Sequence, residues 1–340
     1  MRLLLEAHHP AHIHFFKHSI QQWLQRGDDV LLVGRDRDVM QQLLTAYDYI
    51  PSVIATRAGK NNRFPLQEML LRQLQVARHV RRFQPDAVLS LMGSYCQFAR
   101  VLGVPNLIFT DSEFQHFNHR IAHPFATRIF TPECFYKDLG HKQVKYKGYH
   151  ELAFLHPARF TPDPSVLSEM GVEAGKYVIV RVSAWDTLHD VGQSGFGAAL
   201  DEFLELLLQQ HQVRLVPEKG KLNPKWEHLR LKLPPHRFHD ALAFAKFVVS
   251  EGASTAAEAA CLGVPAVYLN STTRGYLDDM AANYNLVSSH TQARTALLKV
   301  NEWLKIPPDL PTLKAARDQL IADHVDVTQF VVDSVDSLIQ

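Results

Sequence analysis

The chain contains little cysteine, no long apolar run and almost no net charge. Its three cysteines, Cys96, Cys134 and Cys261, lie far apart and form no CxxC pair, which argues against a disulfide framework and a thiolate zinc site. No apolar run approaches the roughly 20 residues of a membrane-spanning helix. The first residues, MRLLLEAHHP, are typical of a strand and too short for a signal peptide. We therefore expect a cytoplasmic protein.

Positive and negative charges are balanced, with 36 Lys and Arg against 35 Asp and Glu, a net charge of +1. The lack of a basic excess argues against a nucleic acid partner. With 340 residues, 46% of them hydrophobic, the chain has room for two domains with substantial cores. Histidine is the unusual feature: there are 19, and 12 of them lie at or before His156.

One stretch, residues 248–270, reads VVSEGASTAAEAACLGVPAVYLN and carries the clearest pattern. A buried strand is followed by a turn of small residues, Glu251–Thr255. The pattern then predicts an Ala-rich helix from about Thr255 to Leu262, ended by Gly263 and Pro265, and a second strand over Ala266–Leu269. This is a βαβ unit with a small-residue turn at the head of its helix.

Such a helix start presents free backbone N–H groups and the positive end of the helix dipole, which together favour a phosphate. We predict that the phosphate contacts come from Gly252, Ala253, Ser254 and Thr255, with the two hydroxyls adding hydrogen bonds. Glu258 lies one turn further on, at a suitable distance for a ribose diol. The alternative is a purely structural crossover whose small helix packs closely on its sheet.

The N-terminal pattern predicts a strand over Arg2–Glu6, a loop to His12, a helix to Gly27 and a second strand. Because ligands of open α/β sheets bind at the carboxyl ends of strands, His12 is well placed for chemistry as a base near neutral pH. The histidines of this loop could instead cap the helix or pack against Phe15. A metal bound by His12 and His14 is a further alternative, but no acidic partner with ligand spacing stands nearby, so we predict no metal.

Two carboxylates, Asp111 and Glu113, follow the predicted strand Asn106–Phe109 and should lie at the same sheet edge as His12. They could orient a histidine, bind sugar hydroxyls or cap the following helix. A predicted helix over Leu66–Phe83 carries arginines on its polar face. These arginines suit a solvated face, or else contact with an anionic acceptor or a membrane surface.

The Gly- and Pro-rich residues 147–164 are typical of a linker. After it a strand is predicted over Tyr177–Val182, with Arg181 and Ser183 at its carboxyl end. A guanidinium there would suit a diphosphate, with a structural ion pair as the alternative. The chain thus divides into an α/β domain over 1–155, a second over 156–325, and a C-terminal helix, 326–340, that could pack back on the first domain.

Two Rossmann-like halves joined by a hinge resemble the GT-B glycosyltransferase architecture, in which two such domains face each other across a cleft. The segment GASTAAEAACLGVPA resembles the nucleotide-sugar signature of the N-acetylglucosaminyltransferase that completes lipid II. That resemblance implies that the turn at Gly252 meets the diphosphate and that Glu258 takes the ribose hydroxyls. Pro10-Ala11-His12 occupies the place of that enzyme's GGH motif, so the likeness there extends to His12 alone.

The chain as a whole resembles domain-of-unknown-function family 354. The matching blocks span most of residues 1–285 and read HPAHIHFFKHSIQQWLQRGDDVLLVGRD, FTDSEFQHFNHRIAHPFATRIFTPECF, KGYHELAFLHP, RVSAWDTLHDVG and SEGASTAAEAACLGVPA. The association of that family with surface-glycan genes implies a sugar-nucleotide substrate. Non-hydrolysing UDP-N-acetylglucosamine 2-epimerases share this fold and a similar turn, and the fold alone does not separate transfer from epimerisation.

The sequence therefore predicts a GT-B glycosyltransferase that needs neither metal nor cofactor and moves a sugar from a UDP-sugar to a glycan or lipid-linked acceptor. An acceptor at the inner membrane surface is one alternative within this prediction. Backbone amides at the turn and Arg181 would stabilise the departing diphosphate. His12 would serve as the base, with Asp111 or Glu113 orienting it or the acceptor. A 2-epimerase and a non-catalytic sugar-nucleotide-binding protein are the alternatives.

Overall fold

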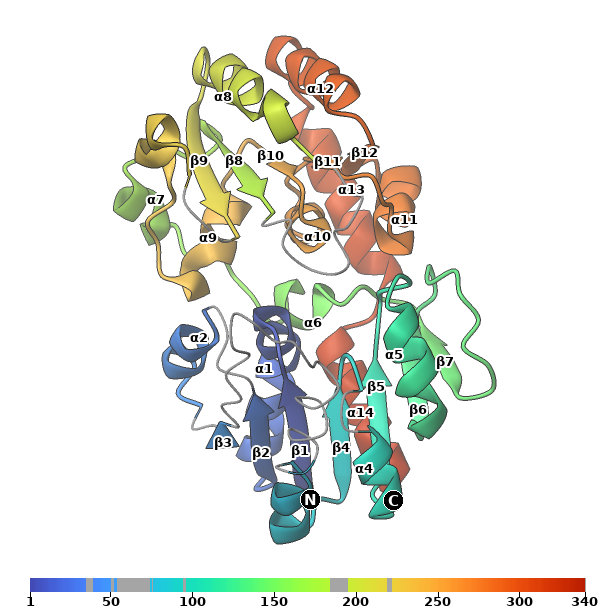
Figure 1. Ribbon diagram of the computed structural model, residues 1–340. Coiled ribbons are helices and arrows are strands. Elements are labelled where there is room, and N and C mark those ends of the chain that lie inside the picture. Colours follow the sequence, from blue (N-terminus) through green and yellow to red (C-terminus); the bar gives the residue numbers. More distant parts are fainter. Residues whose placement is uncertain are drawn as a thin grey trace. The chain divides into compact units, whose positions relative to one another are not determined.

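The computed structural model describes residues 1–34, 39–49, 52–53, 74, 76–93, 96–183, 195–218 and 222–339. The chain divides into two compact units (Figure 1). Unit 1 comprises Met1–Phe154 and Val325–Gln340, and unit 2 comprises Leu155–His324. Residues 76–83 of the predicted helix over Leu66–Phe83 are helical, and most of the remainder lies outside the described residues.

Unit 1 is built on a parallel sheet in the order β3-β2-β1-β4-β5-β6-β7. The central strands are almost continuously apolar and buried, as expected where helices cover both faces of a parallel sheet. The strands are β1 (Arg2–Ala7), β2 (Asp29–Gly34), β3 (Ser52–Val53), β4 (Ala87–Ser90), β5 (Asn106–Phe109), β6 (Arg128–Pro132) and β7 (Gln143–Tyr146).

The helices of this unit differ from the prediction at one informative place. Helix α1 begins at Pro10, because proline has no N–H to lose at a helix start and the ring of His9 accepts a hydrogen bond from the Ala11 N–H. His12 therefore lies in the first turn of a helix, and the predicted loop as far as His12 is wrong. The helices are α1 (Pro10–Gln25), α2 (Met40–Ala46), α4 (Cys96–Val101), α5 (His116–Ile121), the 3₁₀ helix η1 (His123–Phe125), α6 (Leu152–Leu155, whose last residue belongs to unit 2) and α14 (Val327–Ile339).

The C-terminal helix α14 is part of unit 1. The Val325 N–H donates to the Lys147 carbonyl at 2.9 Å, and the Thr328 hydroxyl donates to the Ala153 carbonyl at 2.6 Å. The guanidinium of Arg26 in α1 donates to both carboxylate oxygens of Asp336, at 2.6 and 2.7 Å. A segment more than 150 residues away in sequence thus completes the first unit.

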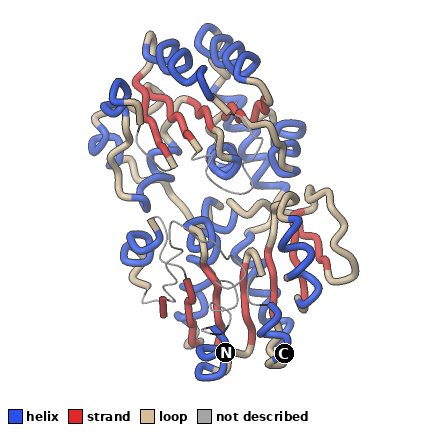
Figure 2. The backbone as a smooth tube through the Cα atoms, in the orientation of Figure 1, coloured by secondary structure: helices blue, strands red, loops and turns tan. Residues whose placement is uncertain are grey.

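Unit 2 has a second parallel sheet, in the order β12-β11-β10-β8-β9, with helices on its faces (Figure 2). Its strands are β8 (Tyr177–Val182), β9 (Gln212–Pro217), β10 (Phe247–Ser250), β11 (Ala266–Leu269) and β12 (Val287–His290). Its helices are α7 (Ser165–Met170), α8 (Leu200–Leu208), α9 (Phe238–Ala243), α10 (Ala253–Cys261), α11 (Gly275–Tyr284), α12 (Ala293–Lys305) and α13 (Leu310–Asp323), with 3₁₀ helices η2 (Gly197–Ala199), η3 (Pro224–Leu229) and η4 (Pro235–Arg237).

Helix α10 begins two residues earlier than predicted, at Ala253, because Gly252 acts as its N-cap in an extended conformation. It ends where expected: Gly263 adopts the left-handed conformation with φ +80°, which a glycine takes without strain. The strand–turn–helix–strand order predicted for residues 248–270 is therefore present.

Each sheet contains a point at which the strand order reverses. In unit 1 the reversal lies between β1 and β4, and in unit 2 between β8 and β10. Connections leave opposite faces of the sheet at such a point, which opens a crevice at the carboxyl ends of the two strands. The predicted fold class, two parallel-sheet α/β domains, is confirmed. Among the described residues, no helix is long and apolar enough to cross a membrane.

Candidate functional site

The turn after β10 lies at the reversal point of unit 2. Ser250 pairs in register with Arg181 of β8, so the carboxyl ends of the two strands are neighbours. The Ser250 hydroxyl donates to the Gly252 carbonyl at 2.7 Å and accepts the Gly252 N–H at 3.0 Å. These two bonds fix the backbone immediately before helix α10.

Helix α10 begins without a side-chain cap among the residues described. The first N–H groups of any helix lack intrahelical acceptors, and here the Gly252 N–H is already donated to Ser250. The amides of Ala253, Ser254 and Thr255 are therefore the N–H groups at this helix start that lack an intrahelical acceptor, and an anion-binding role for them stays a prediction; Ser254 is exposed and Thr255 is buried. Of the four residues predicted to contact a phosphate, Gly252 therefore has no free N–H to donate, because its amide already bonds to Ser250.

Arg181 extends alongside this turn. A Cβ added to Gly252 would lie 3.8 Å from Cγ of Arg181, which places the arginine stem next to the turn. Its Nη1 donates to the Val216 carbonyl at 3.4 Å. Burial lowers the pKa of the guanidinium, and the carboxylates of Glu218 and Glu258 oppose that shift. No carboxylate within the described part of the chain forms an ion pair with Arg181 at 4 Å or less.

Glu258, the predicted ribose-binding residue, is buried one turn into α10. Its Oε1 lies 3.3 Å from Nε2 of His239, which α9 supplies and which is also buried. This contact restrains the carboxylate beside the helix start. No local sequence pattern indicates that His239 meets Glu258, and the structure makes it the partner of that carboxylate.

The sequence analysis missed the role of Glu251, which is 1% exposed. One carboxylate oxygen accepts the Ser183 N–H and the other accepts the Phe196 N–H, both at 2.6 Å. Its backbone carbonyl accepts from Nδ2 of Asn270, after β11, at 3.2 Å. Glu251 thus joins three chain segments to the turn. An acidic residue between a fully apolar strand and a run of small residues was the available signal, because a carboxylate in such a place must accept hydrogen bonds.

His12 is buried at the reversal point of unit 1, with 5% exposure. Its Nδ1 accepts the His8 N–H at 3.4 Å. Burial lowers the pKa of His12 well below its usual value, the neighbouring His9, His8 and His150 lower it further, and a hydrogen bond to the Glu6 backbone partly opposes them. The ring is therefore neutral near pH 7. The catalytic role of His12 stays a prediction.

The two predicted carboxylates have different surroundings. Oδ2 of Asp111 lies 3.3 Å from Nδ1 of His150, and Oδ1 accepts from the Ser112 hydroxyl at 3.0 Å. Within the described residues Asp111 therefore pairs with His150 and not with His12. Glu113 is fully buried, and its backbone carbonyl accepts from Lys137 and from His119. The N-cap residue of α5, Gln115, makes no side-chain cap hydrogen bond.

Two histidines near Glu113, His119 and His123, should make the stability of unit 1 decrease in acid. Nδ1 of His119 lies 3.2 Å from Nδ1 of His123. Burial and the nearby His119 lower the pKa of His123 to about 4, from 6.5. As the pH falls below 6.5 the unfolded chain binds this proton before the folded chain does, so stability should decrease between pH 6.5 and 4 and then level off. One pKa unit corresponds to ~1.4 kcal/mol, so the loss should reach about 3 kcal/mol.

The measurement is chemical unfolding of the wild type and a His123→Asn variant across this pH range. Asparagine retains a polar atom near the position of Nδ1 but does not titrate, so the variant should lose stability less steeply on acidification. His141→Asn is the matched control, because His141 is exposed. Equal slopes for wild type and His123→Asn would contradict the prediction.

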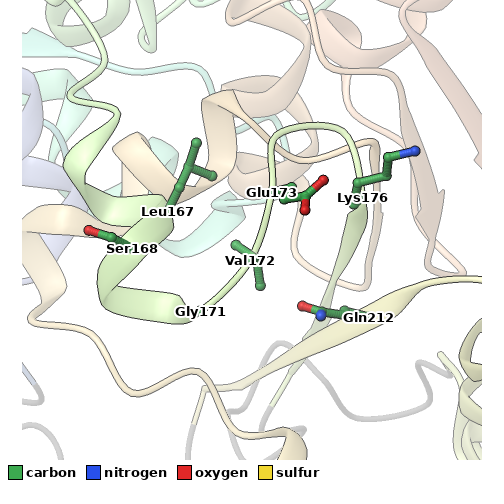
Figure 3. Close-up of a pocket in the computed structure, with 7 residues that line it drawn as sticks. All are labelled: Leu167, Ser168, Gly171, Val172, Glu173, Lys176 and Gln212. Atoms are coloured by element: carbon green, nitrogen blue, oxygen red, sulfur yellow. The ribbon is translucent and has the colours of Figure 1, made fainter.

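A surface hollow of about 400 Å³ lies elsewhere on unit 2 (Figure 3). It is lined by residues around the end of α7 and by Lys176 and Gln212, which stand at the amino ends of β8 and β9. Arg181 and Ser183 lie at the opposite, carboxyl end of β8. The hollow is therefore separate from the site at the turn. Among the described residues, no group of three or more His, Cys, Asp or Glu side chains is arranged to hold a metal ion.

Solved structures with the same fold include nucleotide-sugar enzymes. UDP-N-acetylglucosamine 2-epimerase from Rickettsia bellii is 14% identical, with a TM-score of 0.74 over 100% of this chain and 97% of its own. UDP-GlcNAc 2-epimerase from Neisseria meningitidis, in a structure with UDP-GlcNAc bound, is 11% identical, with a TM-score of 0.72 over 99% and 100%. MurG from Acinetobacter baumannii is 18% identical, with a TM-score of 0.59 over 99% of each chain. At these identities the likeness shows a shared GT-B fold.

Curated protein sequences include none that matches the chain. The model of one protein family does match, over residues 2–292, which is well over half of the sequence. This match includes the sequence blocks that resemble the family, among them the turn at Gly252 and the segment around His150. The chain belongs to DUF354, a family described as proteins of unknown function.

Proposed function

We propose that this protein is a glycosyltransferase that takes a sugar from a UDP-sugar and transfers it, without a metal, to a glycan or lipid-linked acceptor in surface polysaccharide synthesis. The observation that carries the proposal is the pairing of Arg181 with the uncapped start of α10 at the reversal point of unit 2. A helix start and a guanidinium are complementary to a diphosphate in both charge and hydrogen-bond geometry.

In this proposal unit 2 holds the donor. The N–H groups of Ala253, Ser254 and Thr255 and the guanidinium of Arg181 stabilise the negative charge that grows on the diphosphate as the sugar leaves. Glu258, restrained by His239, accepts hydrogen bonds from the ribose hydroxyls. The epimerase structure from N. meningitidis holds UDP-GlcNAc in the same fold, which supports a nucleotide sugar as the ligand class.

Unit 1 would then bind the acceptor and take up its hydroxyl proton. The sequence predicts that His12 is the base that accepts this proton, and that Asp111 or Glu113 orients the base or binds acceptor hydroxyls. These groups follow β1 and β5, on either side of the reversal point of their sheet. Removal of the base should stop turnover and leave UDP binding nearly intact, because the donor contacts belong to unit 2.

The proposal is tested by thermal unfolding with a panel of nucleotides and nucleotide sugars in the presence of EDTA. A ligand at about 100 times its Kd stabilises the folded state by about 2.7 kcal/mol, which raises the Tm visibly. We expect UDP or a UDP-sugar to raise the Tm, and ADP and AMP to have less effect. If no nucleotide raises the Tm, the turn at Gly252 has a structural role alone, and the transferase proposal is wrong.

A UDP-sugar 2-epimerase is the second candidate, favoured by TM-scores of 0.60 to 0.74 to epimerases against 0.59 to MurG. The two activities differ in their need for an acceptor. An epimerase converts UDP-GlcNAc in the absence of any acceptor, whereas a transferase releases UDP and accelerates when an acceptor is added. Nucleotide binding with neither conversion would instead favour a non-catalytic sugar-nucleotide-binding protein.

A further inference from the structure

His150 occupies an arrangement that the sequence did not single out. It follows Tyr149 shortly after β7 and is buried in unit 1. Its Nδ1 lies 3.3 Å from Oδ2 of Asp111, and its ring packs on Phe15 with 4.6 Å between centroids. The Ser112 hydroxyl donates to the other oxygen of Asp111 at 3.0 Å. Aspartate and ring are thus both held in place.

The nearby carboxylate favours one tautomer of His150. An ionised carboxylate only accepts hydrogen bonds, so a carboxylate oxygen 3.3 Å from Nδ1 favours the form with the proton on Nδ1 and the lone pair on Nε2. Nε2 is buried and has no hydrogen-bond partner among the described residues. A buried polar atom without a partner destabilises the folded state, so its persistence calls for an explanation such as a ligand group that completes it.

His12 has the opposite arrangement. Its Nδ1 accepts the His8 N–H, and its ring also bonds to the backbone of Glu6. Because Nδ1 accepts the hydrogen bond from His8, the neutral ring carries its proton on Nε2, and the lone pair of Nδ1 is already engaged by the backbone. The two histidines are close enough for His150 to influence the ionisation of His12.

We propose that Nε2 of His150 is the proton acceptor for the acceptor hydroxyl, with Asp111 as its positioning residue and His12 as a structural neighbour. The assignment rests on the proposed transferase function. In the step, the hydroxyl oxygen bonds to C1 of the sugar as its proton passes to Nε2 of His150. The bond between C1 and the diphosphate oxygen breaks, and its electron pair leaves with UDP.

The electrostatics of the pair suit this role. Burial lowers the pKa of His150, and the charge of Asp111 opposes that shift. The ring is therefore neutral near pH 7 and able to accept a proton, and the carboxylate stabilises the imidazolium that forms. The charged or titratable groups known to act on the ring are Asp111 and His12.

The first arm of the test measures UDP release from UDP-N-acetylglucosamine, with water as the acceptor, for the wild type and for His150→Gln, His12→Gln and His141→Gln. A general base contributes about 10²–10⁴-fold, so we expect His150→Gln to lower the rate at least 100-fold while the UDP-induced rise in Tm is retained. His12→Gln should lose less, and the exposed His141→Gln should match the wild type.

The second arm measures the tautomers directly by ¹⁵N NMR of the imidazole groups in the full chain, with the two variants used for assignment. We expect the Nδ1–H form for His150 and the Nε2–H form for His12. Replacing Asp111 by alanine removes the acceptor at Nδ1, so the Nδ1–H form of His150 should no longer dominate. A purely structural histidine would not link this tautomer change to a loss of rate.

The outcomes separate this assignment from the proposed function. An active His150→Gln variant, or an Nε2–H tautomer at His150, would overturn the assignment alone. So would a larger loss of rate in His12→Gln than in His150→Gln when both variants remain folded by thermal unfolding. A wild-type chain that does not bind UDP, or that binds it and consumes no UDP-sugar, would remove the proposed function and this step with it.

Discussion

Replacing Glu251 by alanine is expected to lower the free energy of unfolding of unit 2 by about 3–5 kcal/mol. Its two carboxylate oxygens accept the Ser183 and Phe196 N–H groups at 2.6 Å, and the side chain is buried. Alanine would leave two N–H groups without acceptors in a place poorly reached by water. Each unsatisfied buried group costs about 1–3 kcal/mol, and bonds to a charged acceptor lie at the upper end of the range.

Glu251→Gln is the matched variant, because glutamine has nearly the same size but only one accepting oxygen. We expect it to lose roughly half as much stability as Glu251→Ala, in chemical unfolding followed by a signal from unit 2 such as Trp226 fluorescence. An alanine variant as stable as the wild type would show that water satisfies both N–H groups, and the structural role given to Glu251 would be abandoned.

Replacing Arg181 by alanine is expected to weaken UDP binding roughly 100-fold. A hydrogen bond to a charged group contributes about 1.5–3 kcal/mol, and 2.7 kcal/mol corresponds to 100-fold. The aliphatic stem of Arg181 lies beside the turn, and within the described part of the chain no carboxylate forms an ion pair with its guanidinium. The stability of the folded state should change little, because the hydrogen bond from Arg181 to the Val216 carbonyl is long at 3.4 Å.

Arg214→Ala provides the control for that experiment. Arg214 is a half-buried arginine on the neighbouring strand β9, its pKa is also lowered by burial, and it donates to the Met170 carbonyl at 2.8 Å. Isothermal titration with UDP should show a large loss for Arg181→Ala and none for Arg214→Ala. Equal affinities in the two variants would place the diphosphate elsewhere. Arg181→Lys should recover part of the lost UDP affinity, because lysine keeps the positive charge but not the paired N–H donors of the guanidinium.

The fold class was predictable because its determinants are local. Apolar runs separated by helical patterns predict parallel strands, and the small-residue turn before an Ala-rich segment predicts a helix start at a strand end. Both sheets and the order of elements around residues 248–270 follow that expectation. The same local patterns also carry the family resemblance that the match over residues 2–292 confirms.

Helix boundaries were less predictable, and the start of α1 shows why. Histidines and a proline after a strand suggest a loop, but Pro10 at the first helical position and the cap from His9 extend the helix over His12. The sequence correctly indicates that His12 stands near a strand end. The first helical turn then sets the direction in which its ring points, and with it the backbone partners of the ring.

The sequence by itself determined the two α/β domains, the turn at Gly252 and the presence of histidines and carboxylates at strand ends, because periodicity and turn chemistry act over a few neighbouring residues. Only the tertiary structure decided which of these groups meet. Glu251 reaches Phe196 across 55 positions, Asp111 reaches His150 across 39, and Glu258 reaches His239 across 19. Each partner is set by the strand order, which brings distant strand ends together, and no local pattern records that order.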